Sequence, residues 1–299
     1  MAWTIYRNTD ASAPVLTGAT GSLITLFDAV LVNGYGSQPA AGWNKVLSST
    51  NRAVYQHFNG KYYRVDDGNV AGSSILRAYE TMSNVDTGSG AIMSGSGGIS
   101  NDFRINKMRT TSSAAPINWT IAADNKTCVV LVATGSDNTW RGTYFGEFYS
   151  YKPGDPYNGC LYGDRVTNYF GFSSAYTLIS SFILFRNYNN VPGSISASVV
   201  AHPLTSGGSG FLFVDNGINP ADGKWWVTEM PILTGTTEYC VRGMLRGCWQ
   251  GLFSAASGIS NNYQFSGSEE SSGRIFEYFK MLNGTTFCLE LTEPPSSSI

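Results

Sequence analysis

The sequence has 299 residues, of which 13% are charged and 13% are aromatic, and its formal net charge is −2. Globular proteins contain roughly a quarter charged residues, so an architecture of long solvated helices, which need Glu, Lys and Arg on their outer faces, is disfavoured. The slightly negative charge also argues against nucleic acid as the main partner. A surface this poor in charge predicts that neighbouring molecules cover part of it.

The first predicted element is a buried helix that begins after Ser22, a good N-cap residue. Apolar side chains surround nearly the whole of the next three turns, namely Leu23, Ile24, Leu26, Phe27, Val30 and Leu31. The pair Asn33-Gly34 readily takes positive φ and is predicted to end the helix. The following loop, residues 34–43, carries Trp43 and is expected to lie across the core.

A β-hairpin is predicted next, over residues 53–65. The stretch AVYQHF is followed by Asn59-Gly60 and then by KYYRV. An Asn-Gly pair between alternating strands is typical of a two-residue hairpin with a type I′ turn.

The rest of the chain is predicted to form many short strands. Residues 74–81 are the next expected strand, and residues 83–101 are expected to form a flexible Gly/Ser loop. Later apolar clusters that also read as strands span residues 118–124, 127–134, 143–151, 176–186, 194–202, 210–215, 224–230, 239–245, 274–279 and 286–291. Their spacing predicts a mainly β fold of antiparallel strands, sandwich-like or barrel-like, with one short buried N-terminal helix.

A polar stretch at residues 108–116, which ends in Pro116, is the best candidate for a domain boundary. It predicts an N-terminal α+β domain, residues 1–112, and a larger all-β domain, residues 113–299. A long crossover within one domain is the alternative.

Several segments of the sequence resemble a family of tailed-bacteriophage virion proteins that are described mostly as structural or tail-associated. The resemblance rests on residues 21–67, 76–90, 119–133, 144–158 and 241–253. It implies a non-enzymatic structural component of the virion, present in several copies and docked on the tail, baseplate or neck. The expected partners are other copies of the chain and other virion proteins. A head decoration protein and a glycan-binding or glycan-cleaving receptor module are the alternatives.

Three acidic residues near one another in the sequence suggest carbohydrate cleavage: Glu147, Asp155 and Asp164. Two carboxylates at a suitable separation can act as acid and base on a sugar. Asp155 stands between Gly154 and Pro156, however, where an Asp often caps a turn. We expect the structural role and therefore no catalytic residue.

Other site chemistry has weaker support in the sequence. The histidines are His57 and His202, without a nucleophile motif or the spacing of a zinc site. The glycine-rich stretch 88–98 lacks the Lys-Ser/Thr ending of a phosphate-binding loop. The acidic pairs Asp66-Asp67 and Glu269-Glu270 are either cation ligands or solvated turns. We expect no enzyme, no cofactor and no metal.

The five cysteines show no CxxC pair. They are Cys128, Cys160, Cys240, Cys248 and Cys288. Free buried thiols are expected. A disulfide between Cys240 and Cys248 would need a tight hairpin between them and an oxidising compartment.

The segment VRGMLRGCWQGLF, residues 241–253, is the predicted subunit contact. Arginine and tryptophan are enriched where interfaces concentrate their binding energy. The predicted interface residues are Arg242, Arg246, Trp249, Leu252 and Phe253. Internal salt bridges of the two arginines and a core position for Trp249 are the alternatives.

The expected location is the virion, after synthesis in the cytoplasm of a bacterial host. The opening residues MAWTIYRN do not resemble a secretory signal. The longest apolar run, residues 175–185, is shorter than the roughly 20 residues of a membrane helix. A buried strand is expected there, and no membrane insertion.

Overall fold

The computed structural model describes residues 2–70, 72–91, 103–107, 115–133, 139–165, 182–184, 186, 198–200, 227–234, 240–251, 260–267, 273–281 and 286–294. The protein is mainly β, with 58% strand in four antiparallel sheets and one 12-residue helix near the N-terminus. The predicted fold class is therefore confirmed.

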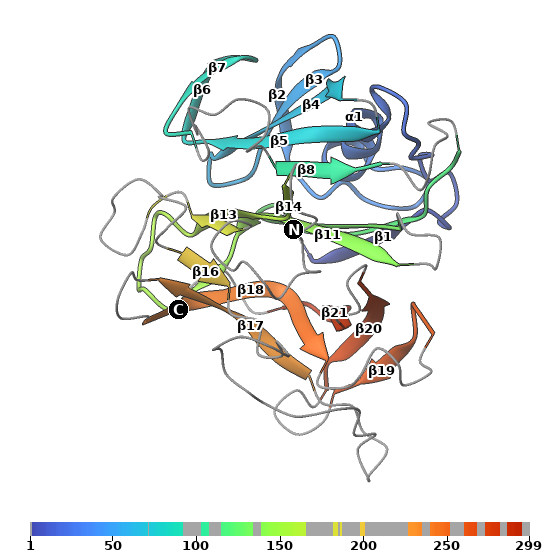
Figure 1. Cartoon of the computed structure of the whole chain (residues 1–299), viewed down its shortest axis with the longest axis vertical. Coiled ribbons are helices and arrows are strands. Elements are labelled where there is room, and N and C mark those ends of the chain that lie inside the picture. The colour runs from blue at the N-terminus through green and yellow to red at the C-terminus, as the bar shows by residue number, and fades with distance from the viewer. Residues whose placement is uncertain are drawn as a thin grey trace.

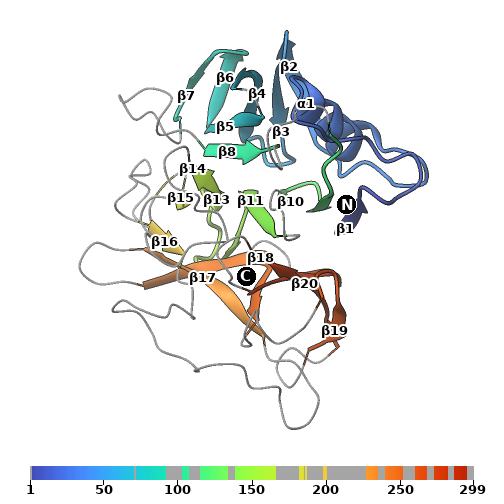
Figure 2. The same ribbon diagram turned by 45° about the vertical axis from the view of Figure 1, so that its right-hand side comes forward.

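Three of the sheets are stacked as layers, which the two views in Figures 1 and 2 both show. The top sheet has the order β14 (Asp164–Arg165), β8 (Phe103–Asn106), β5 (Ser73–Tyr79), β4 (Tyr62–Val70), β3 (Arg52–Gln56) and β2 (Asn44–Ser49). The middle sheet has the order β1 (Thr4–Arg7), β9 (Trp119–Ala123), β10 (Thr127–Ala133), β11 (Trp140–Glu147), β13 (Gly159–Tyr162) and β15 (Phe182–Leu184).

The bottom sheet has the order β16 (Ser198–Val200), β17 (Val227–Thr234), β18 (Cys240–Gly251), β21 (Thr286–Glu290), β20 (Ile275–Lys280) and β19 (Gln264–Ser266). The short strand β12 (Tyr149–Ser150) also pairs with β18. A separate hairpin is formed by β6 (Thr81–Asn84) and β7 (Thr87–Ser89). Residues 83–89 were predicted as part of a flexible loop, and this part of the prediction is wrong.

The central strands of the middle sheet are buried on both faces. All seven residues of β10 are buried, and successive side chains of a strand point to opposite faces. Cys128, Val130 and Val132 join the core beneath the top sheet, while Val129, Leu131 and Ala133 join the core above the bottom sheet. The nearly unbroken apolar sequence of β10 thus serves two cores at once.

The helix α1 (Ser22–Phe27) continues as a π-helical segment, η1 (Asp28–Asn33), and packs into the upper core. The predicted N-cap is wrong, because Gly21, at φ 85°, is the N-cap and Ser22 is the first helical residue. Asp67 of β4 instead accepts a hydrogen bond from the Leu23 amide at 2.9 Å. A long-range carboxylate thus replaces the local cap.

The predicted end of the helix and the course of the next loop are confirmed. Gly34 has φ 75° and donates its amide to the Ala29 carbonyl at 2.8 Å. The ring of Trp43 is buried in the upper core, and its indole nitrogen donates to the carbonyl of Asp124 at 2.7 Å.

The hairpin between β3 and β4 is confirmed, but its predicted type I′ turn is wrong. The Gly60 amide donates to the His57 carbonyl at 2.9 Å, and the His57 amide donates to Lys61 at 3.2 Å. Gly60 has φ 85°, whereas Asn59 is not among the residues with positive φ. The turn is therefore a three-residue loop with a glycine bulge, and the Asn59 side chain reaches Glu147 of the middle sheet.

Strands pair across the predicted boundary near residue 112. Strand β1 pairs with β9 in the middle sheet, and β14 pairs with β8 in the top sheet. Both sheets therefore contain strands from residues 1–112 and from residues 113–299. The division into two domains stays a prediction.

The left-handed backbone at Gly60 predicts the effect of substitution there. A Cβ at this position would make only an ordinary van der Waals contact, with Gln56 Nε2 at 3.8 Å. We expect Gly60→Val to lower the free energy of unfolding by about 1 kcal/mol or more, because a β-branched residue resists positive φ. Gly60→Asn is the matched control and should lower the free energy of unfolding by less than Gly60→Val does. Equal urea midpoints for the parent and Gly60→Val would contradict the turn assignment.

Candidate functional site

Glu147, the first catalytic candidate, lies at the end of β11 and is 1% exposed. Its carboxylate accepts hydrogen bonds from the side-chain amides of Asn59 and, at 3.3 Å, Asn158. The ammonium group of Lys126 lies 3.8 Å away. These contacts come from the hairpin above and from the loops beside β11, so the carboxylate serves as a junction between chain segments.

Asp155, the second candidate, forms a buried ion pair with Arg242 of β18. The Nε and Nη2 atoms of Arg242 donate to Asp155 Oδ2 at 3.0 and 2.7 Å, and the Ser150 hydroxyl donates to the same oxygen at 2.7 Å. The other carboxylate oxygen accepts the Tyr157 amide at 3.0 Å. This last contact is the turn-capping role that the Gly-Asp-Pro sequence indicated.

The third candidate, Asp164, belongs to β14, where its backbone pairs with Arg104; its side chain lies outside the described part of the structure. Glu147 and Asp155 have separate sets of partners. Each of the two carboxylates connects different segments of the chain.

Asp124, a buried carboxylate that was not among the catalytic candidates, joins the bottom and middle sheets. It stands in the turn between β9 and β10, where Oδ1 accepts the backbone amides of Lys126 and Thr127, both at 2.8 Å. Its Oδ2 accepts a hydrogen bond at 2.8 Å from Arg246 of β18, which also donates to the Thr127 hydroxyl at 3.0 Å. The Thr127 hydroxyl in turn donates to the Glu147 carbonyl at 2.8 Å.

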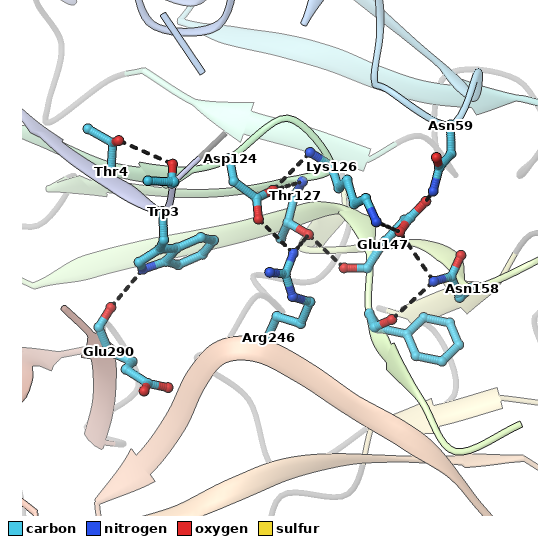
Figure 3. A network of polar contacts seen from close by, with 12 residues as sticks. Trp3, Thr4, Asn59, Asp124, Lys126, Thr127, Glu147, Asn158, Arg246 and Glu290 are labelled. Atoms are coloured by element: carbon cyan, nitrogen blue, oxygen red, sulfur yellow. Dashed lines mark hydrogen bonds and ion pairs between the residues drawn. The ribbon is translucent and has the colours of Figure 1, made fainter. Parts of the chain in front are cut away.

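These contacts form one connected polar cluster, which Figure 3 shows between the layers. We call it the interlayer network and define it as Asn59, Asp124, Lys126, Thr127, Glu147, Asn158 and Arg246. It links the hairpin of the top sheet, a turn and a strand end of the middle sheet, and the central strand of the bottom sheet. Trp3 adds a nearby contact, since its indole nitrogen donates to the Glu290 carbonyl at 2.9 Å.

The acidic pair Asp66-Asp67 has cationic side chains as partners. Asp67 pairs with Lys107, and the two side chains are 0% and 1% exposed, respectively. Asp66 lies 3.2 Å from Arg64. The described residues contain no group of three or more His, Cys, Asp or Glu that could hold a metal ion. Glu269-Glu270 lies outside the described residues.

His57 is buried against aromatic rings beneath the hairpin turn. Its Nδ1 accepts the Asn59 amide at 3.1 Å, and its ring lies 5.6 Å from that of Trp43. Burial, together with the charges of Lys61 and Lys126, lowers the pKa of His57 to about 3. His57 is thus a neutral structural residue at pH 7; His202 lies outside the described residues.

Four of the five cysteines are free buried thiols, as predicted: Cys128, Cys160, Cys248 and Cys288. Burial raises the pKa of each of these thiols. Cys240 and Cys248 both belong to the single strand β18, so the tight hairpin that a disulfide between them requires is not formed.

The structure places the predicted interface residues as follows. The side chain of Arg242 is fully buried and that of Arg246 is nearly so, and both form the internal ion pairs described above. The indole nitrogen of Trp249 donates to Glu290 at 2.9 Å. Leu252 and Phe253 lie outside the described residues. The subunit contact of this segment stays a prediction.

Sequence reasoning missed Asp124, Lys126 and Thr127. The only local signal is an acidic residue at the start of the tight Asp-Asn-Lys turn between two strong strands. Nothing in the local pattern indicates that Arg246, 122 residues further along the chain, is the partner of Asp124.

Neither the protein-family models nor the curated proteins give a match to this chain. No helix among the described residues is long and apolar enough to cross a membrane. Of the apolar run at residues 175–185, the described portion, β15, is a strand.

The pair of Arg246 and Asp124 generates a stability prediction. Arg246→Met should lower the free energy of unfolding by about 3 kcal/mol, the lower end of the range for removing one partner of a buried pair, because Asp124 keeps two backbone donors. The matched control is Arg52→Met, because the Arg52 side chain is 41% exposed in its ion pairs. This substitution should lower the free energy of unfolding by less than about 1 kcal/mol. If urea titrations gave equal losses of unfolding free energy for the two variants, the structural role of the Arg246–Asp124 pair would be contradicted.

The buried histidine generates a pH prediction. The unfolded chain protonates His57 near the ordinary pKa of 6.5, whereas the folded chain does so only near 3. We expect His57 to leave stability unchanged above pH 6.5 and to decrease it by up to about 1.4 kcal/mol per pH unit as the pH falls toward 3. His57→Asn, which keeps an acceptor for the turn, should show a shallower acid loss in thermal melts between pH 7 and 4. If the melting temperatures of the parent and of His57→Asn fell in parallel with pH, the assignment of His57 as a buried neutral residue would be contradicted.

Proposed function

We propose that this protein is a non-enzymatic structural component of a tailed-phage virion, present in several copies and docked on the tail, baseplate or neck. The resemblance of the sequence to virion proteins is the starting point. The observation that carries the non-enzymatic part is the use of the buried carboxylates: Glu147 and Asp155 hold chain segments together through amide and guanidinium partners.

The layered architecture supports the same proposal. A virion component must keep its shape while neighbours bear on its surface, and this protein buries two extended cores on either side of one sheet. Ion pairs such as Arg246–Asp124 resist sliding of one layer over another, because a shift would leave both charges buried without a partner. Low surface charge leaves area suited to contacts with other subunits.

The decisive experiment is the analysis of purified phage particles. We expect quantitative mass spectrometry to find several copies per particle, and cryo-electron microscopy to place them on the tail, baseplate or neck. Density on the capsid surface would favour the head decoration alternative. Absence of the chain from particles that are otherwise complete would overturn the proposal.

A separate assay addresses the glycan-cleaving alternative. The purified protein, incubated with host capsule, lipopolysaccharide or peptidoglycan, should release no fragments above a buffer control. Glu147→Gln and Asp155→Asn are the matched variants, each checked by circular dichroism because both residues have structural partners. Turnover by the parent that is lost in a folded variant would contradict the non-enzymatic assignment.

A further inference from the structure

The ion pair of Lys107 with Asp67 is closed to water at both ends. The side chain of Asp67 is 0% exposed and that of Lys107 is 1% exposed. In the ion pairs of Lys45 and Lys126, by contrast, the lysine side chain is 29% exposed. Among the described lysine pairs, only that of Lys107 therefore holds its nitrogen against a carboxylate without access to solvent.

The surroundings fix both members of this pair. Lys107 Nζ donates to Asp67 Oδ1 and, at 2.8 Å, to the carbonyl of Ala19. The backbone is held as well, because the Lys107 amide donates to the Gly72 carbonyl at 2.7 Å and the Asp67 amide donates to the Asn51 carbonyl at 2.8 Å. Two groups held in contact in a reactive alignment behave as if at effective concentrations of about 10⁵–10⁸ M.

Two further donors polarise the carboxylate of Asp67. The Ser74 hydroxyl donates to Oδ1, the oxygen that also faces Lys107, and the Leu23 amide donates to Oδ2 at 2.9 Å. When an amine adds to the carboxyl carbon, negative charge develops on these oxygens, and fixed O–H and N–H donors stabilise that charge. The arrangement therefore suits acyl transfer from Asp67 to Lys107.

Burial favours a product without charges at this place. Desolvation lowers the pKa of Lys107, while the hydrogen bond and the charge of Asp67 raise it. Two charges removed from water are costly, and an amide bond between the two side chains eliminates both. The pair of Arg242 with Asp155 is equally buried, but a guanidinium group stays protonated and is no nucleophile. The amine of Lys107 does not have this restriction.

We propose that Lys107 and Asp67 condense in the folded chain to form an intramolecular isopeptide bond. A bond forms between Lys107 Nζ and the side-chain carboxyl carbon of Asp67, and the bond from that carbon to Oδ1 breaks. The ammonium group gives two of its three protons to Oδ1, which leaves as water, and the third proton stays on the amide nitrogen. The step consumes no oxidant, cofactor or second molecule.

The bond ties together the two strands on either side of β5. Asp67 belongs to β4, and Lys107 directly follows β8. The two residues are 40 positions apart in the sequence, and a covalent link over such a distance restricts the unfolded chain. The top sheet therefore keeps these strands joined even when the chain is denatured. This inference goes beyond the proposed function and does not depend on it.

Peptide mapping of the full chain by mass spectrometry tests the proposal. The folded parent protein is incubated at growth temperature, denatured and digested with trypsin. We expect residues 65–77 joined to residues 105–109, since an acylated Lys107 is not a cleavage site. The joined peptides should be lighter than the two separate peptides by the mass of one water molecule. The matched control, Lys107→Arg, keeps the positive charge and should give no joined peptides.

Two results would overturn the proposal. The first is recovery of residues 65–77 and 105–107 from the parent as separate, unmodified peptides, which leaves an ordinary buried ion pair. The second is a loss of water confined to residues 65–77, because Asp67 can also cyclise onto the amide of Gly68 without Lys107. The parent protein alone distinguishes these results, so the test remains valid if Lys107→Arg fails to fold.

Discussion

Burial of both faces of the central strands of the middle sheet is the constraint on which the rest of the structure depends. Every residue of β9 and β10 is buried, so these strands have no solvent-facing side on which polar residues are tolerated. Fully burying a valine or leucine contributes about 1.5–3 kcal/mol, and β10 places such side chains alternately in the upper and lower cores. The top sheet, with the helix, and the bottom sheet must therefore both be in place for the middle sheet to be stable in water.

This arrangement concentrates polar groups where the buried strands end and turn. Backbone and side-chain polar atoms at these ends are removed from water and need partners inside the protein. Asp124, Glu147 and Asp155 satisfy these groups and pair with cations or amides from other layers. A buried ion pair adds little net stability compared with an apolar contact. Its effect here is to fix the position of one layer on the next, because misplaced layers would leave charges without partners.

These buried contacts between layers also bear on the proposed function. Glu147 and Asp155, which the sequence suggested for carbohydrate cleavage, each accept hydrogen bonds from donors on other chain segments. The β3–β4 hairpin shows such a contact: Asn59 donates to Glu147 and His57 packs against the ring of Trp43, whereas Phe58 is exposed.

The sequence by itself determined the mainly β fold class, the buried helix, several strands of the middle sheet and four free thiols, because alternation, apolar runs and turn residues are local signals. TCVVLVA and the Asn59-Gly60 turn are examples, although the turn is a three-residue loop and not the predicted type I′ turn. Glu147 and Asp155 were recognised as notable carboxylates, but their partners were not. Arg242 pairs with Asp155, 87 residues away in the sequence, and Arg246 pairs with Asp124, 122 residues away. Only the tertiary structure decided these pairings, since they depend on how the layers stack, and no local pattern encodes which distant charge lies opposite.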